Sequence, residues 1–111
     1  MEYFASQETE RVQLDEKSWV DIKKEMSYGD TQKLAASFMK MRLQSKGDID
    51  SDIDIETGNI ELLLINIADW NLVDEKGKKV PVIRENIRRL KSSTAETILT
   101  AIGERNQPPK A

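Results

Sequence analysis

The sequence predicts a mainly helical α+β domain, with about four helices and a short N-terminal β-hairpin. Apolar residues alternate with polar ones near the N-terminus, at Val12 and Leu14 and again at Val20 and Ile22. Helical spacing dominates the rest of the chain, whose 111 residues suffice for one hydrophobic core. We therefore expect a single domain over residues 11–105, between a flexible leader (1–10) and a flexible tail (106–111).

The composition argues against several classes of function. Charged residues make up 33% of the chain and hydrophobic residues 38%, as in ordinary soluble proteins. The chain has no cysteine and no histidine, so it lacks disulfides, thiolate ligands and the commonest general base. A net charge of −3 argues against nucleic-acid binding, and the N-terminus does not resemble a signal peptide. We expect a cytoplasmic protein with no cofactor, no nucleic-acid partner and no membrane partner.

The N-terminal hairpin is predicted from two short, half-buried strands. A turn at residues 15–18 follows the strand that contains Val12 and Leu14. In the second strand, Val20 and Ile22 face the same side. Because an isolated hairpin is marginally stable in water, we expect these strands to lie on the helices.

The first helix is predicted from Thr31 to Leu43, with Ser27 or Asp30 as its N-cap. Its apolar stripe is wider than one core contact requires. The stripe consists of Leu34, Ala35, Ala36, Phe38, Met39, Met41 and Leu43. One interpretation is a helix that is simply well buried. The other is a second face for a partner, to which the methionine side chains adapt easily.

Residues 45–57 are predicted to form an acidic loop, in which Asp and Glu alternate with isoleucine. The spacing of the first aspartates is similar to that of a calcium-binding loop. However, such a loop needs glycine where Ile53 stands and a bidentate glutamate where Asn59 stands. A solvated acidic loop is therefore the favoured interpretation over a calcium site.

The stretch from Asn59 to Leu72 is predicted to be the central helix around which the other segments pack. Drawn as a helix, it is apolar on nearly every side, but it is too short and too interrupted to span a membrane. Trp19 and Trp70 are interpreted as core anchors, because large aromatic side chains are mostly buried. The alternative for Trp70 is a partner-binding surface around it.

The last third of the chain predicts a turn and two helices. Residues 73–81 form the turn, in which Gly77 takes a positive φ. Apolar residues at Ile83, Ile87 and Leu90 then fall at helical spacing. The final helix is expected to be capped by Ser92 or Ser93, where the sequence Ser-Thr-Ala-Glu fits a capping box, and to close at Gly103.

No catalytic arrangement can be assembled from these residues. The acidic side chains cluster in a segment expected to be solvated, and the five glycines are scattered, so no phosphate-binding loop is present. We therefore expect the protein not to be an enzyme. The charge layout is more informative, since residues 48–56 are acidic and residues 76–91 are mainly basic. Either both are solvated faces, or they associate with copies of the chain or with a charged partner.

Two parts of the chain resemble the tail assembly chaperones of long-tailed bacteriophages. The front half of the resemblance is Val12-x-Leu14, then Trp19-Val20-x-Ile22, then Ser27-Tyr28-Gly29-Asp30 at the start of a helix. The back half is the run from Asp69 to Lys78, which begins Asp-Trp-Asn, with Pro81 and a short helix after it. The resemblance covers Val12 to Ile102, and the acidic segment has no place in the family pattern.

The resemblance implies a non-catalytic assembly factor. Members of this family act in the host cytoplasm, bind the tape measure protein, keep it soluble and help to recruit tail tube subunits. They are generally absent from the finished virion. On this hypothesis the partner-binding candidates are Phe38, Met39, Met41 and Trp70. Two alternatives remain: a virion structural or connector protein that self-associates, and a small regulatory protein that binds a host factor.

Overall fold

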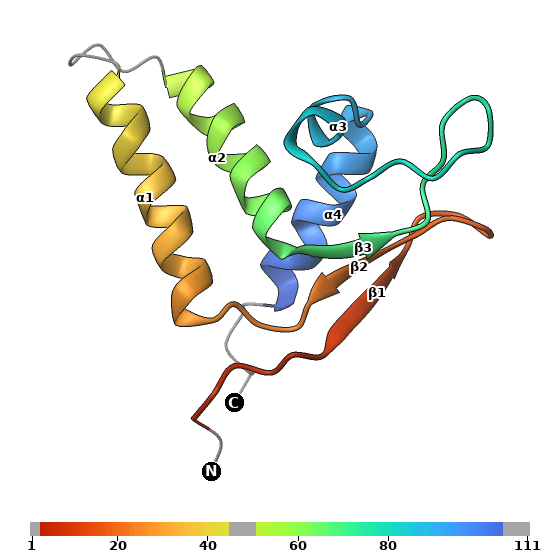
Figure 1. Ribbon diagram of the computed structural model, residues 1–111, viewed down its shortest axis with the longest axis horizontal. Helices are drawn as coiled ribbons and strands as arrows, with labels where there is room; N and C mark the ends of the chain where they lie inside the picture. Colours follow the sequence, from red (N-terminus) through yellow and green to blue (C-terminus); the bar gives the residue numbers. More distant parts are fainter. Residues whose placement is uncertain (1–2, 45–50, 106–111) are drawn as a thin grey trace.

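The protein is described here from a computed structural model that covers residues 3–44 and 51–105, and the side chains of residues 3–40 and 57–105. Within these residues the chain forms four helices and a three-stranded antiparallel sheet (Figure 1). The elements are β1 (Thr9–Gln13), β2 (Trp19–Lys23), α1 (Tyr28–Gln44), α2 (Ser51–Asn66), β3 (Ile67–Trp70), α3 (Arg84–Arg88) and α4 (Ser92–Arg105). The predicted α+β class is confirmed.

The N-terminal hairpin forms as predicted. β1 pairs with β2 so that Val12 lies opposite Val20. The turn between them is closed by Asp15, whose carboxylate accepts hydrogen bonds from the backbone N–H groups of Lys17 (2.8 Å) and Ser18 (2.7 Å). β1 begins at Thr9, inside the stretch expected to be a leader, because Thr9 still pairs with the last residue of β2.

The predicted central helix from Asn59 to Leu72 is wrong at both ends. α2 begins at Ser51 and ends at Asn66, and the next four residues form β3. β3 pairs with the second edge of β2, which places Trp70 opposite Val20. This long-range pairing provides hydrogen-bond partners for the backbone N–H and C=O groups on the second edge of β2. If the helix continued to Leu72, these groups would lack that pairing, so tertiary structure outweighs the local helical pattern.

The predicted acidic loop over residues 45–57 is also wrong in its second half, since the helix already includes residues 51–56. Acidic residues are favoured in the first turns of a helix, where the backbone dipole is positive. Residues 45–50, together with the side chains of residues 41–56, lie outside the part of the chain that the structure describes. The choice between a solvated segment and a calcium loop therefore stays a prediction.

The hydrophobic core lies where α2, α3 and α4 meet the sheet. Its buried members are Val20, Ile22, Ile60, Leu63, Ile67, Trp70, Ile87, Ile98 and Ile102. Trp70 is only 1% exposed, and its indole N–H donates a hydrogen bond of 2.5 Å to the carbonyl of Val80, so its role as a core anchor is confirmed. Trp19 is half-buried, with the guanidinium of Arg11 3.7 Å from the centre of its ring.

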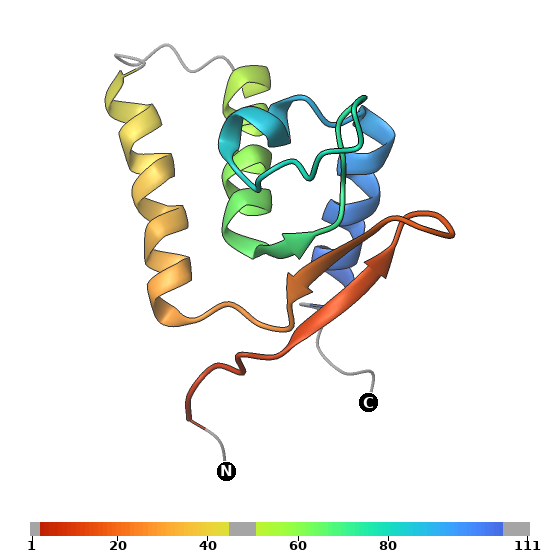
Figure 2. The ribbon, with the colours of Figure 1, turned by 45° about the vertical axis from the view of Figure 1, so that its right-hand side comes forward.

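Helix α1 packs along α2 and is the outermost element in two views (Figures 1 and 2). Its start is a reciprocal capping box, in which the Ser27 hydroxyl accepts from Asp30 N–H (3.0 Å) and the Asp30 carboxylate accepts from Ser27 N–H (3.2 Å). Of the two predicted caps, Ser27 is thus confirmed, but the predicted start at Thr31 is wrong, because α1 begins at Tyr28, directly after this cap. At the other end of the chain, α4 continues through Gly103 to Arg105, so the predicted stop at Gly103 is wrong.

Candidate functional site

The outward side of α1 carries a row of uncharged side chains that no other described element covers. Tyr28, Gln32, Ala35 and Met39 are all exposed, Tyr28 at 79% and Met39 at 69%. Their spacing of four, three and four residues places them one above another on one side of a helix, in the pattern of a coiled-coil contact. We call these four residues the outer seam.

Phe38 is the neighbour of Met39 but faces a different direction. A Cβ atom added to Gly58 of α2 would lie 2.8 Å from both Cε1 and Cζ of the Phe38 ring. The ring therefore occupies space that only a glycine at that position leaves open, and it is 42% exposed. Adjacent helix residues point about 100° apart, so Phe38 belongs to the α1–α2 contact and Met39 to the outer seam.

The other two predicted site residues give different outcomes. Met41 lies in the last turns of α1, and its side chain is outside the part that the structure describes. Trp70 is buried and cannot itself present a large surface to a partner. It does, however, form one wall of a pocket, so the alternative of a partner surface around Trp70 stays a prediction.

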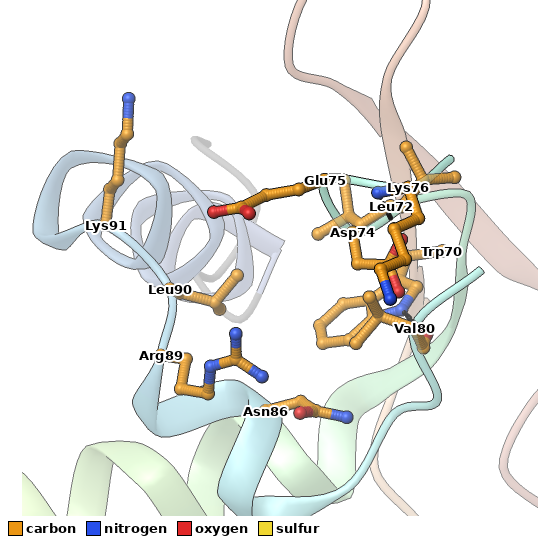
Figure 3. A pocket seen from close by; sticks show the side chains of 11 residues that line it. Trp70, Leu72, Asp74, Glu75, Lys76, Val80, Asn86, Arg89, Leu90 and Lys91 are labelled. Atoms are coloured by element: carbon orange, nitrogen blue, oxygen red, sulfur yellow. Dashed lines mark hydrogen bonds between the residues drawn. The ribbon is translucent and has the colours of Figure 1, made fainter. Parts of the chain in front are cut away.

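This pocket of about 690 Å³ opens between α3 and the turn after β3 (Figure 3). Its apolar walls come from Trp70, Leu72, Val80 and Leu90. Its polar and charged lining consists of Asp74, Glu75, Lys76, Asn86, Arg89 and Lys91. Figure 3 shows the guanidinium of Arg89 directed into the opening, beside Leu90 and toward Trp70. We call this the Arg89 pocket.

Hydrogen bonds within the turn hold the walls of the Arg89 pocket in place. The Asp74 carboxylate accepts from the backbone N–H groups of Lys76 (2.8 Å) and Lys78 (3.0 Å). Gly77 adopts a φ of 79°, as the sequence predicts, and its N–H donates to the carbonyl of Asp74. Across the pocket, the Asn86 side chain donates to the carbonyl of Pro81 at 2.9 Å. The pocket is therefore largely formed before any ligand arrives.

Several charged groups near these surfaces already have partners. Arg84 pairs with the largely buried Glu61 at 2.6 Å, and Lys79 pairs with Asp69 at 3.0 Å. The Lys79 hydrogen bond, with a backbone hydrogen bond from Trp70, lowers the pKa of Asp69. Arg89, in contrast, has no ion-pair or hydrogen-bond partner for its side chain among the described residues.

The described residues contain no group of three acidic side chains that could hold a metal ion. Nor does the described part of the chain include a helix with the length and apolar character needed to cross a membrane. Comparison of the chain with protein-family models, with curated proteins and with solved structures gives no match. The fold and its surfaces define a small α+β domain with two candidate contact regions, the outer seam and the Arg89 pocket.

Sequence reasoning included Ala35 and Met39 in the apolar stripe but missed Tyr28 and Gln32 of the outer seam. Both of these residues precede the stripe, which begins at Leu34, and neither is aliphatic. A heptad count along the helix would have found the seam. No periodic pattern in the sequence indicates the Arg89 pocket. One wall comes from residues 70–80 and the other from residues 86–91, and only the folded turn brings them together.

Proposed function

We propose that the protein is a non-catalytic tail assembly chaperone of a long-tailed bacteriophage, which binds helices of the tape measure protein along the outer seam. The observation that carries this proposal is the exposure of Met39 and Tyr28 on the outermost helix, without a charged residue between them in the seam. The resemblance to tail assembly chaperones supports the same assignment. Its segment from Ser27 to Asp30 is the capping box that starts α1.

The outer seam has the geometry that a helical partner requires. α1 has 17 residues and is therefore about 25 Å long, enough for several turns of a partner helix. Ala35 allows two helix backbones to approach closely, and Met39 adapts its shape to different partner side chains. This side-by-side contact between two helices suits a long helical client with many similar apolar stripes.

On this proposal the protein works in the host cytoplasm and is absent from the mature virion. Its main partner is the tape measure protein, and the tail tube protein is a second partner at the stage when tube subunits are recruited. Nucleic acid and membranes have no part in this function. The alternative of a virion structural protein differs in one observable respect, because such a protein remains in purified particles.

The proposal is tested by co-expression with the proposed partner, a long helical tape measure protein, followed by a pull-down from the soluble fraction. The informative variant is Met39→Asp, which places a charge in the outer seam. The matched control is Ser93→Asp, which adds the same charge at an exposed position on α4. Burial of a methionine side chain contributes about 1.5–3 kcal/mol, so we expect Met39→Asp to weaken the complex at least about tenfold.

The wild-type protein and Ser93→Asp are expected to keep the long protein soluble and to co-purify with it. Met39→Asp is expected to remain folded but to lose the complex. If the long protein stays insoluble with the wild type, or if both variants bind it equally well, the proposal is wrong. Recovery of the protein from purified particles would favour the structural alternative.

A further inference from the structure

We infer that the Arg89 pocket is a second, separate binding site, and that its ligand is an acidic peptide segment of a partner protein with one aliphatic side chain among its carboxylates. This inference does not depend on the tail-assembly proposal, because it rests on a different part of the molecule. The outer seam belongs to α1, whereas the Arg89 pocket lies between α3 and the turn after β3.

The apolar part of the pocket has room for an aliphatic side chain. Leu72, Val80 and Leu90 are half-buried, so each of them already leaves part of its surface open to a ligand. The bond from the Trp70 indole to Val80 and the bonds around Asp74 hold the turn side of the pocket in shape, and the bond from Asn86 to the carbonyl of Pro81 ties α3 to the end of that turn. A preformed pocket of this kind loses little conformational entropy on binding.

The charged part of the pocket favours a ligand that carries carboxylates. The guanidinium of Arg89, which has no partner among the described residues, points into the opening, and Lys76 and Lys91 also line it (Figure 3). A guanidinium next to an apolar surface is well suited to a carboxylate that is held close to an apolar side chain. The lining itself carries three cationic side chains, Lys76, Arg89 and Lys91, against two acidic ones, Asp74 and Glu75. The pocket therefore has a cationic excess in a chain whose net charge is −3.

The two acidic groups in the lining do not outnumber its three cations. Asp74 directs its carboxylate to the N–H groups of its own turn, away from a ligand, although its charge remains. A nucleic acid is a poor fit, because single strands bind by stacking bases on exposed aromatic rings and Trp70 is only 1% exposed. An extended acidic peptide satisfies the apolar walls and the cationic rim together.

The inference is tested by titrating the isotope-labelled protein with an acetylated pentapeptide that has a central leucine between two pairs of aspartates. The chain has two tryptophans, and they provide an internal comparison. The indole N–H signal of Trp70, at the pocket, is expected to move on binding, while that of Trp19 is expected to stay in place. Replacement of the peptide leucine by serine is expected to weaken binding about tenfold.

Two protein variants distinguish binding in the pocket from attraction of the peptide by the overall charge of this face. Arg89→Glu is expected to weaken binding at least about tenfold, because it reverses the charge inside the pocket. Arg88→Glu makes the same change one residue away, outside the pocket lining, and is expected to change affinity less than about twofold. The spectra of the free variants also show whether each one keeps the native fold.

Several results would overturn the inference. Equal losses for Arg88→Glu and Arg89→Glu would mean that only the overall charge of this face attracts the peptide. Equal binding of the leucine and serine peptides would mean that the apolar walls are not used. Self-association of the free protein that Arg89→Glu abolishes would identify a second copy of the chain as the occupant. A failure of the tail-assembly proposal leaves all of these comparisons unchanged.

Discussion

Phe38 and Met39 are neighbours in α1, but the structure predicts that they respond very differently to substitution by aspartate. More than half of the Phe38 side chain is covered, and its ring fills the space next to Gly58. Loss of a fully buried phenylalanine costs about 3–5 kcal/mol, so this partly covered ring accounts for about 2 kcal/mol of the unfolding free energy. Met39→Asp, at an exposed position, is expected to change that free energy by about 0.5 kcal/mol or less.

The assay is urea unfolding of the wild type and the two variants, followed by far-ultraviolet circular dichroism. Both substitutions place the same residue at adjacent helical positions, so their intrinsic helix propensities have nearly the same effect. The difference between Phe38→Asp and Met39→Asp therefore reports the contact between α1 and α2. Equal stability of the two variants would refute the assignment of Phe38 to this contact.

A double-mutant cycle tests the same contact without adding a charge. In the wild type, the new methyl group of Gly58→Ala would lie 2.8 Å from two atoms of the Phe38 ring, so the ring must move and part of the gain in helix propensity is lost. In a Phe38→Ala background the ring is gone, and the same substitution is expected to stabilise the helix by about 1 kcal/mol. If Gly58→Ala had the same effect in both backgrounds, the close approach of Phe38 would be disproved.

Three further predictions concern stability and are checked by urea unfolding. Arg84→Met leaves the carboxylate of Glu61 largely buried without its partner, and is expected to cost about 2 kcal/mol; a loss below about 0.5 kcal/mol would contradict this. Gly77→Ala is expected to cost about 1 kcal/mol, because φ is 79° there, and an unchanged midpoint would contradict a rigid turn. Burial raises the pKa of Asp30, but hydrogen bonds from Lys23 and Ser27 outweigh it and lower the pKa below 3.8. The stabilisation from the ionised Asp30 is therefore present above that pH and lost as the pH falls through the folded-state pKa, so the pH dependence of Asp30→Asn is expected to be flatter below about pH 4. Identical pH profiles for this variant and the wild type would refute this.

The sequence was sufficient for elements whose pattern is local. The alternation at Val20 and Ile22 predicts β2, and Ser27 is one of the two residues predicted to cap α1, although the helix begins at Tyr28 and not at Thr31. β3 was missed because Ile67–Trp70 continues an apolar run that is also compatible with a helix. Only the pairing with β2, which lies about fifty residues earlier in the chain, distinguishes the two structures, and a local pattern contains no such information.

The candidate site was predictable only in part for the same reason. Apolar residues identify α1 as amphipathic, but the orientation of α1 on α2 decides which of Phe38 and Met39 is free to bind a partner. Gly58 of α2 leaves the space that the Phe38 ring occupies, and nothing in the sequence of α1 indicates this contact. The Arg89 pocket depends on the positive φ of Gly77 and on the bond between Trp70 and Val80, which are properties of the folded turn.

The most direct test of the central claim is amide hydrogen exchange of the protein, free and in complex with the tape measure protein that we propose as its partner. α1 is packed on α2 but otherwise open, so its amides are expected to exchange readily in the free protein. The account predicts that the complex slows exchange in residues 28–40 and leaves residues 73–91 unchanged. Absence of a complex, or a complex that protects another element and leaves α1 unprotected, would contradict it.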